Sequence, residues 1–82
     1  MRVFVYSLEK ILYEGEAKSL TAKTSLGEIT VLDNHRPLIT DILKSVLKVI
    51  DLNNKEHYFE TSSGFLEVNN SNEVKALIEN AF

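Results

Sequence analysis

Turn-forming residues divide this 82-residue chain into short apolar segments, with a turn about every ten residues. The clearest turns are Leu52-Asn53-Asn54 and Asn69-Asn70-Ser71-Asn72, because asparagine tolerates the positive φ angles that tight turns need. Short segments at this spacing are typical of antiparallel β-sandwiches and barrels. The chain therefore predicts a single all-β domain over residues 1–82, an antiparallel β-sandwich or flattened barrel of about eight to ten short strands.

The first segments carry strand patterns. Val3–Leu8 has apolar residues on both faces, which predicts an inner strand covered on both sides. Ile11–Thr24 is predicted to be extended, with a bulge or bend at Gly15 and with Leu20 and Ala22 on one face.

The later segments are separated by turns. Val46–Asp51 and Lys55–Ser62 predict a hairpin around the first asparagine turn. Ser62-Ser63-Gly64 then predicts a turn before the next strand. Glu73–Glu79 alternates best, with Leu77 as the exception. Its inward-facing residues are predicted to be Val74, Ala76 and Ile78.

One segment has two interpretations. The apolar residues between Leu38 and Ile50 recur at helical spacing, and Pro37 suits the first turn of a helix. The β-branched residues of the same segment, Val46 and Val49 among them, favour strands instead. The residues alone leave helix and strand open here.

Composition argues against several classes of function. The chain has no cysteine, so it has neither a disulfide framework nor a thiolate metal site. The 9 basic and 12 acidic residues give a net charge of −3 without a basic stripe, which argues against nucleic-acid binding. No apolar run approaches the roughly 20 residues that span a bilayer, and the N-terminus lacks a secretion-signal pattern. We expect a soluble intracellular domain without direct membrane insertion, which a partner can hold at a membrane.

Residues 26–40 concentrate the chemically special residues. They include one of the three glycines, the only proline and one of the two histidines. Such a loop is where function is sought first. A docking surface is one interpretation, because Glu28 can accept hydrogen bonds and His35 offers a flat ring with a polar edge. Ordinary turn composition explains the same residues equally well, so the residues alone leave both interpretations open.

Chemical alternatives for the same residues are weaker. A metal site would have to combine Asp33, His35, Asp41 and the distant His57 without any cysteine. A nucleophilic serine in Ser62-Ser63-Gly64, activated by His35 and an aspartate, lacks the Gly-x-Ser-x-Gly elbow. Three separated glycines form no phosphate-binding loop. We expect no catalytic residues, no metal and no cofactor.

Several short motifs follow one another along the whole chain. They are Tyr6-Ser7, Tyr13-Glu14-Gly15, Gly27-Glu28-Ile29, His35-Arg36-Pro37-Leu38-Ile39-Thr40 and Gly64-Phe65-Leu66-Glu67-Val68. In this order and at this spacing, the chain resembles the N-terminal β-sandwich domain of the epsilon subunit of F-type ATP synthases. Each motif alone is weak, and the set is specific.

The chain departs from that family in three ways. Asp33-Asn34 stands where the family usually has proline-glycine, and Lys44-Ser45 where it often has another such pair. The resemblance nevertheless favours strands for residues 38–50. The sequence stops at Ala81-Phe82, where most family members continue into a two-helix hairpin. We therefore expect neither hairpin-mediated inhibition nor ATP sensing.

The resemblance implies two sets of contact residues. Those that match positions facing the gamma subunit are Ser7, His35, Arg36 and Thr40. Those that match positions facing the polar loops of the membrane c-ring are Gly27, Glu28, Ile29, Thr30, Val31 and Leu32.

The resemblance also implies a function. The domain is expected to be a non-catalytic rotor component that links gamma to the c-ring, couples proton flow to ATP synthesis and does not form homo-oligomers. Its expected location is peripheral, at the cytoplasmic face of the bacterial inner membrane. Two alternatives stay open: a small stand-alone β-barrel that binds a ligand or peptide with the His35 loop at its mouth, and a minor enzyme with His35 as general base.

Overall fold

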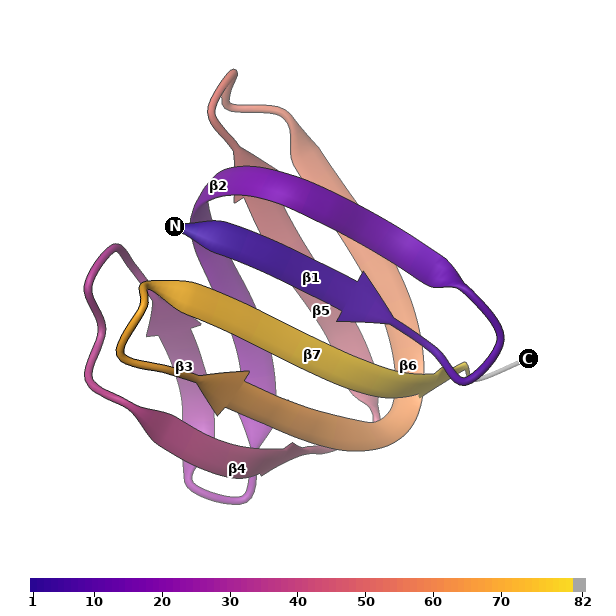
Figure 1. The fold of residues 1–82 in the computed structure, drawn as a ribbon. Helices are drawn as coiled ribbons and strands as arrows, with labels where there is room; N and C mark the ends of the chain where they lie inside the picture. Colours follow the sequence, from indigo (N-terminus) through magenta and orange to yellow (C-terminus); the bar gives the residue numbers. More distant parts are fainter. Residues whose placement is uncertain (81–82) are drawn as a thin grey trace.

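The computed structural model describes residues 1–80, and Ala81-Phe82, where we expected the hairpin to be missing, lie outside the described residues. The described chain forms a β-sandwich close to a barrel (Figure 1). Its strands, in chain order, are β1 (Arg2–Tyr6), β2 (Ile11–Thr24), β3 (Gly27–Val31), β4 (Leu38–Ile42), β5 (Ser45–Asp51), β6 (Glu56–Val68) and β7 (Glu73–Asn80). The all-β sandwich is confirmed, with seven strands in residues 1–80 rather than eight to ten.

The strand count is lower because β2 and β6 are long and each serves both layers. In β2, residues 11–16 pair with β1 and residues 19–24 pair with β3 or β5. In β6, residues 56–61 pair with β5, and residues 63–68 pair with β7 and β4. The two layers are therefore joined through continuous strands, as Figure 1 shows.

Irregular pairing marks the two places where these strands change layer. The register of β2 shifts between Ala17 and Ser19, and that of β6 shifts between Thr61 and Ser63. A bulge of this kind bends a strand without ending it. The bend predicted at Gly15 is wrong, because Gly15 pairs in regular register with Val3. The turn predicted at residues 62–64 is also wrong, since these residues lie inside β6.

We define two layers from this pairing. The front layer contains residues 11–16 of β2, then β1, β7, residues 63–68 of β6, and β4. The back layer contains β3, residues 19–24 of β2, β5 and residues 56–61 of β6. Pairing is antiparallel except between β1 and β7, which are parallel, so the sheet is mixed rather than purely antiparallel.

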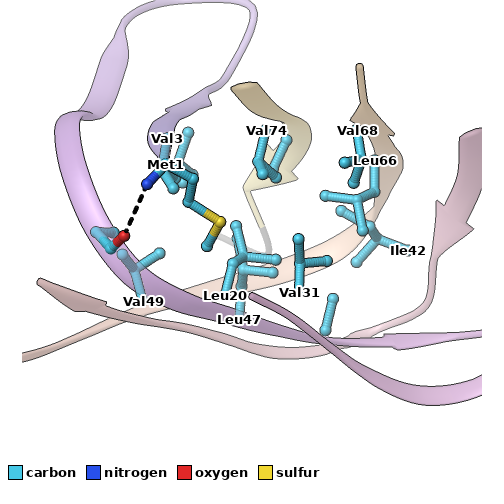
Figure 2. Packing of buried hydrophobic residues seen from close by; sticks show 14 of the residues in the cluster. Met1, Val3, Leu20, Val31, Ile42, Leu47, Val49, Leu66, Val68 and Val74 are labelled. Atoms are coloured by element: carbon cyan, nitrogen blue, oxygen red, sulfur yellow. Dashed lines mark hydrogen bonds between the residues drawn. The ribbon is translucent and has the colours of Figure 1, made fainter. Parts of the chain in front are cut away.

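Apolar side chains from both layers meet in one core (Figure 2). Val3 and Val5 reach it from β1, while Leu20 and Leu47 reach it from β2 and β5. The alternation predicted for β7 is confirmed, since its buried residues are Val74, Ala76 and Ile78. No helix in residues 1–80 has the length and apolar character needed to cross a membrane.

The prediction that Val3–Leu8 is covered on both faces is wrong. The strand ends at Tyr6, and Leu8 is 90% exposed. Within β1, Val3 and Val5 are buried whereas Phe4 and Tyr6 are only half-buried. The strand is an inner one in the sheet, because β2 and β7 flank it, but only one of its faces lies on the core.

Both asparagine turns are confirmed. Asn54 has φ 64° and Asn72 has φ 58°, the left-handed backbone that asparagine tolerates. Residues 38–50 are strands, as the resemblance favoured, because β4 and β5 are two short alternating strands separated by Leu43 and Lys44. The Ser45 hydroxyl donates to the Leu43 carbonyl at 2.8 Å and helps to close that connection.

Candidate functional site

A row of apolar side chains crosses the outer face of the front layer. The paired positions across the layer are, in order, Asp41 of β4, Phe65 of β6, Leu77 of β7, Tyr6 of β1 and Ile11 of β2. We call Phe65, Leu77, Tyr6 and Ile11 the apolar row. Phe65 is 64% exposed and Ile11 is 62% exposed, and the other two are half-buried. A contiguous exposed apolar patch on the surface of a domain is a candidate interaction site.

A groove adjoins one end of the apolar row. It has a volume of about 410 Å³ and contains Phe65 and Leu77 in its lining, together with Leu8 and Leu43. Asp41, Lys44 and Glu79 add charges to the same lining. The combination of an apolar floor with a few charged groups resembles the centre and rim of a protein interface.

Strand β3 forms an exposed edge of the back layer. It pairs with β2 alone among the strands of residues 1–80, so its other edge is free of strand pairing. Glu28 and Thr30 point to solvent, whereas Val31 is buried in the core and Ile29 packs against it. Of the residues predicted to face the c-ring, Glu28, Thr30 and the exposed Leu32 present their side chains outward.

The loop between β3 and β4 carries two of the predicted gamma contacts, His35 and Arg36. Arg36 is exposed, and the half-buried His35 has its Nδ1 atom 2.7 Å from the Arg36 carbonyl oxygen. The His35 amide donates to the Leu32 carbonyl at 3.2 Å. The His35 ring is therefore held within its own loop.

Asp33, just before His35, is tied to the rest of the domain. Its carboxylate forms an ion pair with the ammonium group of Met1 and accepts a hydrogen bond from the Asn72 side-chain amide at 3.2 Å. These hydrogen bonds, first the one from the ammonium group and then the one from Asn72, lower the pKa of Asp33 below its usual value. The first half of the loop is therefore fixed at the edge of the sandwich.

The structure does not bring the four predicted gamma contacts together. Met1, at the start of β1, contacts Asp33 beside the His35 loop, whereas Ser7 follows the other end of β1, about 20 Å away along the strand. Figure 1 shows the β1–β2 turn and the β3–β4 loop at opposite ends of the molecule. Thr40, between them on β4, is only 9% exposed and donates from its hydroxyl to Asp41 at 3.2 Å.

Ser7 shapes the turn in which it lies. Its Oγ atom accepts hydrogen bonds from the amides of Glu9 and Lys10, both at 3.3 Å. The Ser7 amide donates to the Lys10 carbonyl at 2.9 Å. This turn presents Leu8 at the groove.

Asp41 joins β4 to the turn between β2 and β3. One carboxylate oxygen accepts from the Ser25 amide at 3.0 Å and from the Ser25 hydroxyl at 2.7 Å. These bonds, the backbone one first, lower the pKa of Asp41. Nearby, the Leu43 amide donates to the Lys23 carbonyl at 2.8 Å, so the end of β4 is fastened to the other layer.

The residues weighed for metal binding or catalysis have other partners. No group of three or more His, Cys, Asp or Glu in the described residues is arranged to hold a metal. His57 lies 2.9 Å from Asp51, and this hydrogen bond is the main reason that the pKa of Asp51 is lowered. The Ser62 hydroxyl donates to the Glu79 carbonyl at 3.2 Å rather than to a histidine.

The apolar row is the feature that the sequence prediction missed. Its signal was present: Leu77 was the exception to the alternation of its strand, and Val3–Leu8 was apolar on both sides. Leu77 in β7 and Tyr6 in β1 are apolar residues of the outer face. The strand register brings these residues together, because it pairs Leu77 with Phe65 on one side and with Tyr6 on the other.

Comparison with known proteins gives one family and several relatives. The model of the β-sandwich domain of the ATP synthase delta/epsilon chain matches residues 1–82. An ATP synthase epsilon chain of Clostridium perfringens is 31% identical over 80 residues. That match covers 98% of this chain, which spans about 59% of the length of the relative.

Solved structures share the fold. A chain in the Euglena gracilis mitochondrial ATP synthase has a TM-score of 0.86 at 22% identity, covering 93% of this chain and 48% of that one. A chain in the central stalk and c-ring structure of the Tetrahymena thermophila mitochondrial ATP synthase has a TM-score of 0.81 at 17% identity. The second match covers 98% of this chain and 63% of the other, and at these identities both comparisons establish similarity of fold.

Proposed function

Because this chain belongs to the family of β-sandwich domains of the ATP synthase delta/epsilon chain, we propose that it is a non-catalytic component of the central stalk of a proton-translocating F-type ATP synthase. In this role it links the gamma subunit to the c-ring and lies peripherally at the cytoplasmic face of the bacterial inner membrane. The name of the Clostridium perfringens relative, an ATP synthase epsilon chain, supports the proposal. So does the shared fold with a chain of the Tetrahymena thermophila central stalk and c-ring structure.

The observation that carries the proposal is the apolar row. We propose that it is the surface that binds gamma. Ser7 lies at one end of the front layer, and His35 and Arg36 lie at the other. A single partner that touches both ends has to cover the face between them, which carries the apolar row. Burying one large apolar side chain contributes roughly 1.5–3 kcal/mol, so this row would supply much of the affinity.

The edge strand β3 is the proposed surface for the c-ring loops. It belongs to the other layer, and its exposed side chains, Glu28 and Thr30, are polar. Polar side chains on an edge suit a polar loop, whereas the apolar row suits a packed interface. Two surfaces of different chemistry on one sandwich allow the domain to hold two partners at once. Strands β2 and β6 run through both layers, so the two surfaces are joined by continuous strands.

Calorimetric titration of the cognate gamma subunit tests the proposal. The wild-type domain is expected to form a one-to-one complex. Phe65→Asp should weaken it at least tenfold, because the interface would then have to bury a carboxylate among apolar side chains. Val46→Asp is the matched control, since Val46 is a 52% exposed apolar strand residue of the back layer. Failure of the wild type to bind folded gamma would overturn the proposal.

A further inference from the structure

Asn72 joins three separate segments of the domain. Its backbone carbonyl accepts from the Arg2 amide at 3.1 Å, at the start of β1. Its side-chain oxygen accepts from the Asn34 amide at 2.7 Å, and its side-chain nitrogen donates to Asp33 at 3.2 Å. The turn between β6 and β7 is thereby tied to β1 and to the β3–β4 loop.

Asparagine is well suited to this position. The backbone of Asn72 has φ 58°, which favours asparagine or glycine over other residues. An amide side chain also offers an acceptor and a donor on one group, and here each is used by a different residue of the loop. Glycine at position 72 would keep the positive φ angle and lose both side-chain hydrogen bonds, the one from Asn34 and the one to Asp33. Aspartate would keep the acceptor and place a second carboxylate beside Asp33.

The segment held by Asn72 directly precedes His35 and Arg36. Asn34 itself has φ 61°, a conformation that a free loop would leave readily. The only proline of the chain is Pro37, at the far end of the loop, so residues 33 and 34 have no restraint of that kind. Hydrogen bonds from outside the loop supply the restraint instead.

We propose that Asn72 is a positioning residue that preorganises the His35–Arg36 segment for its partner. This inference rests on the proposed function, in which that segment contacts gamma. A loop that is ordered before binding loses less conformational entropy on binding, so its affinity is higher. Asn72 thus acts on the contact through Asp33 and Asn34 and need not touch the partner.

The first experiment replaces Asn72 by glycine in the whole domain. N72G is expected to raise the exchange rate of the Asn34 amide proton at least tenfold, as measured by NMR, and to weaken binding to gamma about three- to tenfold. N54G is the matched control, because Asn54 has nearly the same φ, 64°, in a turn whose side-chain partner is Lys18. It should leave both the Asn34 exchange rate and the affinity for gamma unchanged.

The second experiment reverses the bond between Asn72 and Asp33. N72D should weaken gamma binding through repulsion between two carboxylates. D33N/N72D restores one amide facing one carboxylate, keeps an acceptor for the Asn34 amide and leaves one negative charge near the Met1 ammonium group. This double variant is expected to recover affinity towards the wild-type value, and a failure to recover would count against the inference.

The outcomes separate the two proposals. An unchanged exchange rate of the Asn34 amide in N72G would show that the Asn72 side chain does not hold Asn34 in place. Faster exchange with wild-type affinity would show that the tie does not position the contact segment, and the proposed function would stand. A wild-type domain that does not bind gamma would overturn the proposed function, and this inference with it.

Discussion

Gly64 of β6 lies directly against the backbone of Leu77 in β7, with no room for a side chain between them. A Cβ atom on Gly64 would overlap the Leu77 carbonyl oxygen and lie 3.1 Å from the Cα atom of Ile78. We expect Gly64→Ala to lower the free energy of unfolding by about 2 kcal/mol, because the two strands would have to move apart. Urea denaturation measures this change.

Gly15→Ala is the control for that substitution. The atoms nearest to a Cβ atom on Gly15 would belong to the Tyr13 side chain, at 3.8 Å or more, which is ordinary contact. Its free energy of unfolding should stay within about 0.5 kcal/mol of wild type. Equal stabilities of the two alanine variants would contradict the close approach of β6 and β7.

Thr61 supports the bulge at which β6 changes layer. Its buried hydroxyl lies 2.7 Å from the Ser63 carbonyl and 3.1 Å from the Glu79 carbonyl. Thr61→Val keeps the shape and removes the one hydroxyl donor, so the Ser63 carbonyl loses its side-chain partner, while the Glu79 carbonyl still accepts from the Ser62 hydroxyl. We expect a loss of about 1–3 kcal/mol in unfolding free energy by urea denaturation. Thr30→Val should change it by less than about 0.5 kcal/mol, because the hydroxyl pair of Thr30 and Thr21 is exposed to water.

Acid should weaken the link between Asp41 and Ser25. The folded-state pKa of Asp41 is lowered from its ordinary value of 3.8 by the hydrogen bonds from Ser25. Asp41 therefore contributes stability above that ordinary value, and the contribution is lost as the pH falls through the lower folded-state pKa. In thermal melts between pH 2 and 6, Asp41→Asn should show a smaller loss of stability on acidification than wild type.

Ser25→Ala separates the two bonds that Asp41 accepts. It removes the hydroxyl donor and keeps the backbone donor, so the pKa of Asp41 should rise part of the way to its ordinary value. Carbon-detected NMR titration of the Asp41 carboxyl group measures this directly. A pKa that does not move in the alanine variant would mean that the hydroxyl bond does not form in solution.

Charge reversal on the edge strand β3 tests the proposed surface for the c-ring loops. Glu28→Lys is expected to weaken co-sedimentation of the domain with vesicles that contain the c-ring at least tenfold, because Glu28 is exposed on β3. Binding to gamma should be unchanged. Glu60→Lys makes the same charge change at an exposed position of β6, so it controls for net charge. Equal effects of the two variants would show that β3 has no special role.

Local chemistry was sufficient to predict the two asparagine turns and the inward face of β7. Asn54 and Asn72 adopt positive φ because that tolerance belongs to the asparagine residue itself. The inward face of β7 was predictable because side chains alternate along any strand. Residues 38–50 were ambiguous for a local reason as well, since two short strands joined by two residues reproduce helical spacing.

The candidate surfaces were predictable only in part. Glu28 is exposed on an edge strand and Arg36 is exposed in a loop, so both side chains are accessible to a partner. The burial of Thr40 and Val31, the separation of Ser7 from His35, and the link from Asn72 to Asp33 were not visible in the sequence. Each of these depends on residues far apart along the chain.

The sequence by itself determined the two asparagine turns, the alternation of β7 and the positions of the apolar residues, because these properties extend over only a few neighbouring residues. The tertiary structure decided where β2 and β6 change layer, that β1 runs parallel to β7, and that Phe65, Leu77, Tyr6 and Ile11 stand in one row. The stable strand order and register are those in which both layers bury their apolar inner faces at the same time. That is a condition on the whole chain, and no single segment contains it.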